Sequence, residues 1–175
     1  MNYLEELDIQ PNVRSFFEPY LRDRHHWIAG DPALAKDWFI CASKIDALAW
    51  LELNHQRYRD LTNLCFLTIG AVPHQFHAAF IQNHAPKRKL HFVFSNDDLG
   101  ALCDLKLASY VRNKPLKVTW SENSYLVNFE NKHFEFKLLS LNALEKASGY
   151  NFRIRTHKPK NTITYYEQLS NRHRT

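Results

Sequence analysis

The chain has 175 residues, 45% of them hydrophobic and 14% aromatic, which is enough for one well-packed core and too few for two full domains. Its formal net charge is +5, no apolar stretch has the length of a membrane helix, and residues 1–8 carry acids without a base, unlike a secretory leader. We therefore expect a cytoplasmic globular protein that does not enter the membrane, with its three cysteines buried as free thiols because they lack paired spacing.

The first half of the chain predicts an α/β fold. Residues 1–24 are typical of one or two helices, and residues 26–32 of a short strand and turn. Four short apolar runs then begin near Trp38, Leu64, Leu90 and Leu116, about 26 residues apart. Because parallel strands need a crossover of this length, we expect about four strands in a mainly parallel sheet flanked by helices.

Three helices are expected between these runs. The first begins at Ser43, whose hydroxyl can form a capping box with Asp46. The second follows Pro73, a residue suited to a first helical turn. The third begins at Asn96 or Asp97 and reaches about Arg112.

The pattern changes after the fourth run. Residues 125–129 and 133–138 alternate in hydropathy around a short turn, which predicts a β-hairpin. Its aromatic side chains could stack on unpaired bases, although packing on the core is the preferred interpretation. A helix over residues 140–148 should end at Gly149, and residues 151–156 could add an edge strand.

The positive charge is concentrated in the last 26 residues, which hold six bases and one acid, Glu167, whereas the first 149 residues are balanced. The bases are Arg153, Arg155, Lys158, Lys160, Arg172 and Arg174. Such a segment can follow phosphates electrostatically, so these six residues are the candidate nucleic-acid contacts. A solvated terminus that only aids solubility is the alternative.

Two segments carry a family resemblance. Residues 38–48 read WFICASKIDAL and residues 92–100 read FVFSNDDLG. They resemble the two signature segments of the Toprim (topoisomerase-primase) family, in which a Glu ends the first strand and an Asp-x-Asp pair ends a later one. The resemblance covers residues 36–121 and implies a Toprim-like α/β core. It leaves residues 1–35 as an N-terminal flank, residues 122–156 as a hairpin and helix extension packed on the core, and residues 157–175 as a basic tail.

The catalytic positions of that family are largely replaced in this chain. Ala42 stands at the Glu position and Ser95 at the first Asp position, while Asp97 is kept. Ala42 cannot move a proton, and a neutral serine oxygen is a poor ligand for Mg²⁺. Asp97 and Asp98 could at most hold Mg²⁺ weakly with help from substrate phosphates, and Asp46 is a further residual acid. We therefore assign no cofactor to this site and do not expect it to be catalytic.

Three functional hypotheses follow. The leading one is a catalytically degenerate Toprim-like domain that binds nucleic acid, DNA more than RNA, in a primase-like, replication, recombination or mobile-element setting. The second is a protein-interaction module without nucleic-acid contact. The third is a weak magnesium-dependent nuclease or nucleotidyl transferase that uses Asp46, Asp97 and Asp98. The sequence identifies neither the partner nor the oligomeric state.

Overall fold

The computed structural model describes residues 9–22 and 27–172, with the side chain of residue 22 excluded. Its helices are α1 (Pro11–Arg22), α2 (Lys44–Asn54), α3 (Gln75–His84), α4 (Asp98–Val111), α5 (Leu141–Ser148) and α6 (Tyr165–Arg172). Its strands are β1 (Ile28–Ala29), β2 (Asp37–Cys41), β3 (Leu64–Thr68), β4 (Lys89–Val93), β5 (Leu116–Ser121), β6 (Ser124–Phe129), β7 (Lys132–Phe136) and β8 (Ile154–His157). The α/β class expected from the sequence is confirmed.

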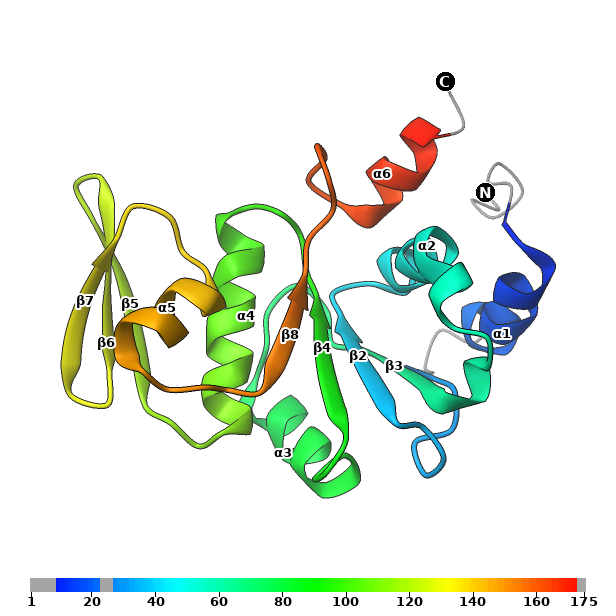
Figure 1. The fold of residues 1–175 in the computed structure, drawn as a ribbon, viewed down its shortest axis with the longest axis horizontal. Helices are drawn as coiled ribbons and strands as arrows, with labels where there is room; N and C mark the ends of the chain where they lie inside the picture. The colour runs from blue at the N-terminus through cyan, green and yellow to red at the C-terminus, as the bar shows by residue number, and fades with distance from the viewer. Residues whose placement is uncertain (1–8, 23–26, 173–175) are drawn as a thin grey trace.

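The main sheet has five strands in the order β1-β3-β2-β4-β8. The last four strands are parallel to one another, and β1 pairs antiparallel with β3. Strands β2, β3 and β4 are nearly continuous buried runs, as is typical of parallel strands covered on both faces. Figure 1 shows β2, β4 and β8 side by side, with α6 lying beyond their carboxyl ends.

The prediction that the run at Leu116 forms the fourth parallel strand is wrong. This run is β5, which pairs antiparallel with β6 in a separate three-stranded sheet, β5-β6-β7. The position beside β4 belongs to β8, which the sequence suggested only as an edge strand. The physical reason is visible in the run itself, because Lys117 and Thr119 alternate with apolar residues and are exposed, a pattern that suits a sheet with one open face.

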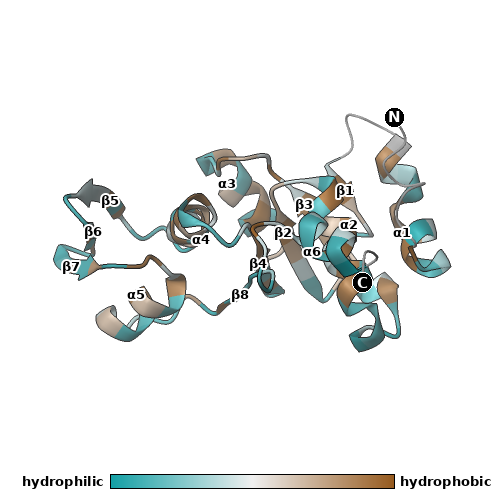
Figure 2. Cartoon of the chain, turned by 90° about the horizontal axis from the view of Figure 1, so that it is seen from above, coloured by the Kyte–Doolittle hydropathy of each residue, from teal (hydrophilic) through white to brown (hydrophobic). Residues whose placement is uncertain are grey.

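The five-stranded sheet separates two apolar cores. Residues of α3, α4 and α5 pack with the side chains on one face of the sheet, and α1, α2 and α6 pack on the other. Figure 2 shows this layering, with α3 and α4 on one side of the strands and α2 and α6 on the opposite side. All three cysteines are buried and unpaired, as predicted.

Most local sequence cues for helix and turn boundaries are confirmed, but Pro73 precedes His74, the N-cap of α3, and so lies outside the first turn of that helix. Ser43 accepts a hydrogen bond from Asp46 N at the start of α2, and Asp97 is the N-cap of α4. Gly149 ends α5 with a φ of 73°. The β6–β7 turn has φ values of 49° at Glu130 and 63° at Asn131, the backbone of a tight two-residue hairpin.

The hairpin aromatics face the core, as the preferred interpretation expected. Phe129 is only 1% exposed. Tyr125, Phe134 and Phe136 are partly buried and pack against the same cluster as Phe129. Because these rings pack against the core, they do not present a set of exposed faces on which bases could stack.

The C-terminal segment is folded against the core. Helix α6 packs on α2 through the buried side chains of Tyr165 and Leu169. The part of the predicted basic tail, residues 157–175, that the structure describes is therefore folded, with His157 in β8 and residues 165–172 in α6, and it is not the solvated terminus of the alternative interpretation. Arg174 and the predicted helical residues 1–8, 23 and 24 lie outside the described residues.

Candidate functional site

The two signature segments meet at the carboxyl edge of the main sheet. Strands β2 and β4 are parallel neighbours, and Cys41 is paired in register with Val93 at their ends. Ala42 follows directly after Cys41, and Ser95 lies two residues after Val93. Ala42 and Ser95 are therefore on the same edge of adjacent strands, where an open α/β sheet usually places its ligands.

Asp97 is held by the first turn of α4. One of its carboxylate oxygens accepts hydrogen bonds from Gly100 N at 2.7 Å and from Ser95 Oγ at 2.6 Å. Burial alone would raise the pKa of Asp97, but these hydrogen bonds and the nearby Lys158 ammonium together lower it below its usual value. Asp97 therefore has a complete structural explanation as an ionised helix cap.

The other two residual acids are directed to different partners. Asp98 hydrogen-bonds to Tyr125 at the start of β6, which raises the pKa of that phenol. Asp46 accepts from Ser43 Oγ at 2.9 Å and from Tyr166 N at 3.2 Å, so it joins the start of α2 to α6. Asp46, Asp97 and Asp98 thus act in three separate hydrogen-bonded groups.

Lys158, which the sequence placed among the nucleic-acid contacts, is used inside the fold. Its ammonium lies 2.8 Å from Ser95 O and 2.8 Å from Asp104 Oδ2. The Asp104 side chain is only 2% exposed, and burial raises its pKa to about 6 although Lys158 acts in the opposite direction. Next to this pair, Asn96 N donates to Ile163 O at 2.8 Å. The segment after β8 therefore closes over the carboxyl edge.

Asp104 is the residue of this edge that the sequence interpretation missed. It lies in the apolar helical run ALCDLKL, between the buried residues Cys103 and Leu105. An acid within an apolar helical stretch indicates a buried partner, because an unpaired carboxylate is rarely tolerated in a core. The identity of that partner, Lys158, could not be read from a separation of 54 residues.

A second buried polar group joins β2, β4 and β8. His91 Nε2 lies 3.0 Å from Asp37 Oδ1, and His91 Nδ1 lies 2.9 Å from His157 Nε2. Hydrogen bonding to the carboxylate indicates that Nε2 of His91 carries the proton, so that Nδ1 accepts from His157. Burial lowers the pKa of His157 to about 4 and also lowers the pKa of His91. The group is a neutral histidine pair beside a carboxylate, packed between Phe39 and Trp50.

The remaining candidate nucleic-acid residues do not share one surface. Arg153 and Arg155 line a hollow at the amino end of β8, on the opposite edge from Ser95. Lys160 is exposed in the segment before α6, and Arg172 ends that helix. The six predicted contacts are therefore divided between both edges of the sheet, apart from Arg174, whose placement is outside the structure described.

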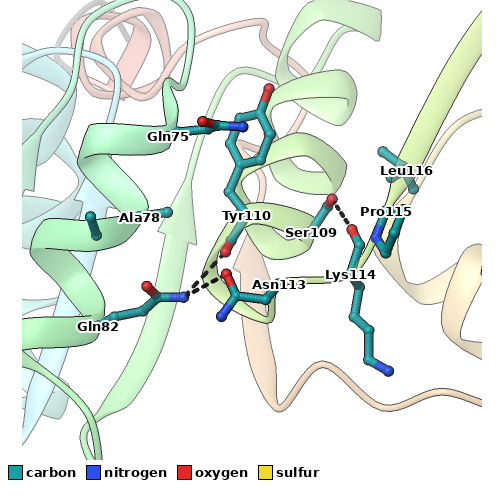
Figure 3. A pocket seen from close by; sticks show the side chains of 10 residues that line it. Gln75, Ala78, Gln82, Ser109, Tyr110, Asn113, Lys114, Pro115 and Leu116 are labelled. Carbon is teal, nitrogen blue, oxygen red and sulfur yellow. Dashed lines mark hydrogen bonds between the residues drawn. The ribbon is translucent and has the colours of Figure 1, made fainter.

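A hollow of about 540 Å³ lies between α3, α4 and β5. Figure 3 shows the side chains that line it. Gln82 Nε2 donates to Val111 O at 2.8 Å and to Tyr110 O and Asn113 Oδ1 at 3.3 Å. Ser109 Oγ donates to Lys114 O across the same turn. These bonds tie the C-terminal ends of α3 and α4 together, so Gln82, Ser109 and Asn113 at this hollow already have structural partners.

No protein-family model, curated protein or solved structure matches this chain. Within residues 9–22 and 27–172, no three His, Cys, Asp or Glu side chains are grouped so that they could hold a metal ion. Over the same residues, none of the helices combines the length and apolar character needed to span a bilayer.

Proposed function

We propose that this protein is a catalytically degenerate Toprim-like domain that binds nucleic acid, DNA more than RNA, in the cytoplasm and does not cleave it. The setting that fits the resemblance is replication, recombination or mobile-element transfer. The observation that carries the proposal is that the carboxyl edge of the sheet is occupied by the protein's own side chains. There, a protein ammonium, Lys158, occupies the neighbourhood of Ser95 and Asp97.

The chemical argument has two parts. A metal that clamps phosphates is best held by several carboxylates that point to one place, but Oδ1 of Asp97 already accepts two protein hydrogen bonds, and the two oxygens of Asp46 accept from Ser43 and Tyr166. The Lys158 ammonium adds a positive charge that opposes Mg²⁺ binding at this edge. Meanwhile the net charge of +5 favours association with polyanions.

The test is fluorescence anisotropy with labelled single-stranded DNA, duplex DNA and RNA of equal length, over a salt series from about 50 to 200 mM. We expect binding at low salt that weakens steeply as salt rises, and intact oligonucleotide after incubation with Mg²⁺ or Mn²⁺. Absence of binding to all three probes at the lowest salt would remove the proposal. Metal-dependent cleavage that is lost in Asp97→Asn would replace it with the nuclease hypothesis.

A protein-interaction module is the second candidate, and the three-stranded sheet favours it. Strand β7 is an edge of that sheet and has a pairing partner on one side, β6. Leu126 on β6 and Leu138 after β7 are 45% and 79% exposed, and Trp120 on the opposite edge strand, β5, is 56% exposed. An open edge with apolar neighbours is suited to strand addition by a partner. Partners that are retained from a lysate after nuclease treatment would favour this function over nucleic-acid binding.

A further inference from the structure

A strongly basic hollow lies at the amino edge of the main sheet, opposite the signature segments. It has a volume of about 590 Å³ and is formed by the chain between α3 and β4, the end of α4, and the approach to β8. These elements meet toward the bottom of Figure 1. Six of its lining side chains are cationic and one, Glu145, is acidic. The cations are Lys87, Arg88, Lys89, Arg112, Arg153 and Arg155.

Two of the cations and the single acid are fixed by backbone contacts. Arg112 Nε donates to Phe152 O at 2.7 Å, and Glu145 Oε1 accepts from Phe152 N at 2.7 Å. Arg88 Nη2 donates to Ala33 O at 2.8 Å. Glu145 is thus engaged with a main-chain amide, and the two guanidinium groups are held in place at the wall of the hollow.

The other basic side chains are more open. Lys87, Lys89, Arg153 and Arg155 are exposed, and their side chains make no hydrogen bond or salt bridge with the part of the chain that the structure describes. A lysine or arginine without an internal partner contributes little to folding when it is exposed. Four such side chains around one hollow, beside two fixed guanidinium groups, create a local excess of positive charge.

Helix ends alone do not account for this cluster. Helices α3 and α4 both end at this edge, and the negative end of a helix dipole attracts cations. However, the bonds that Arg88 and Arg112 make go to Ala33 and Phe152, which lie outside both helices. Lys89 is the first residue of β4 and Arg153 directly precedes β8, so their position is not set by a helix terminus.

We propose that this hollow holds the phosphodiester backbone of the nucleic acid, an inference that rests on the proposed nucleic-acid-binding function and assigns its contact surface. The excess of cations over one engaged carboxylate is complementary to a chain of phosphates. Arginines fixed in advance can donate to phosphate oxygens without first losing side-chain freedom. Contact therefore occurs at the amino edge, while the carboxyl edge stays closed by the protein itself.

The lining also determines what the hollow does not recognise. Its uncharged residues are Ala85, Pro86, Leu90, Asn151 and Ile154, and it includes no aromatic ring. Without a ring, bases have no stacking partner, and sequence is read mainly through base edges rather than phosphates. We therefore expect binding that depends on salt and on probe length but not on base sequence.

The experiment compares two triple variants with the same change in net charge. The first, Lys87→Gln, Lys89→Gln and Arg153→Gln, removes three of the four exposed cations of the hollow and leaves Arg155 in place. The second, Lys117→Gln, Lys132→Gln and Lys137→Gln, removes three exposed lysines on and beside the β5-β6-β7 sheet. Both sets are exposed, and circular dichroism checks that each variant remains folded. Anisotropy is measured with single-stranded and duplex DNA over the salt series, with poly-glutamate as a competitor.

We expect the first variant to bind at least about tenfold more weakly and to lower the slope of log affinity against log salt by about 2 to 3, whereas the second stays close to wild type. Equal loss in both variants would overturn the assignment of the hollow and leave nucleic-acid binding intact. Equal competition by poly-glutamate at matched charge would overturn the assignment to a phosphodiester backbone. If the wild type binds no probe, the proposed function fails together with this inference.

Discussion

The ammonium of Lys158 lies 2.8 Å from Oδ2 of Asp104, which joins the segment after β8 to the middle of α4. The Lys158 side chain is 28% exposed and the Asp104 side chain 2%, so the carboxylate is shielded from solvent whereas the ammonium is partly accessible. One ion pair therefore both neutralises a carboxylate in the core and fixes the chain that covers the carboxyl edge. Breaking it should affect stability and the closure of that edge together.

Replacing Lys158 by Met should destabilise the fold by about 2 to 4 kcal/mol at neutral pH, because Asp104 would be left buried without its counter-charge. Chemical denaturation measures this change. Lys160→Met is the matched control, since Lys160 is exposed in the same segment, and we expect a change within about 0.5 kcal/mol. Similar losses in both variants would show that the ion pair is not the cause.

The contribution of Asp104 to the free energy of unfolding should depend on pH. Its folded pKa of about 6 lies above the ordinary value of 3.8, so the folded chain binds the additional proton between these limits. The stability that this raised pKa gives is present below about pH 4 and is lost as pH rises through about 6. Relative to Asp104→Asn, the wild type should therefore lose roughly 3 kcal/mol between pH 4 and 7. A constant difference in the free energy of unfolding would contradict the raised pKa.

The contribution of His157 to the free energy of unfolding should change with pH in the opposite direction. Its pKa is lowered from 6.5 to about 4, so the unfolded chain binds a proton that the folded chain does not. Its contribution is present above about pH 6.5 and is lost as pH falls toward 4. The imidazole resonances of His157 should titrate near pH 4, and the stability of the wild type relative to His157→Gln should rise by roughly 3 kcal/mol over this range. A midpoint near 6.5 would disprove the buried neutral pair.

Gly100 should tolerate no side chain. A Cβ atom at this position would lie 2.0 Å from Ser95 O, so Gly100→Ala must displace the first turn of α4 or the segment that follows β4. We expect a loss of about 2 kcal/mol or more. Gly70→Ala is the comparison, because Gly70 has a φ of 79° but no atom within 4 Å of a new Cβ, and its cost should be about 1 to 2 kcal/mol from backbone strain alone. Denaturant titration of both variants separates the steric effect from the conformational one.

Local features were predictable because neighbouring residues determine them. Ser43 and Asp97 cap their helices through bonds to residues three positions away, and Gly149 ends α5 through its own backbone freedom. The nearly continuous apolar runs of β2, β3 and β4 likewise required burial on both faces. Because parallel strands end at the same edge of a sheet, the residues that follow β2 and those that follow β4 were expected to lie close together at that edge.

The sequence by itself thus determined the helix caps, the hairpin turn, the three central strands and the shared edge of Ala42 and Ser95. Only the tertiary structure decided that β8 rather than β5 lies beside β4, that Lys158 pairs with Asp104, and that four cations from residues 87–112 join Arg153 and Arg155 around one hollow. The physical reason is that these relationships join residues far apart in the chain. Their partners are selected by burial and charge in the assembled fold, and spacing along the sequence does not encode that choice.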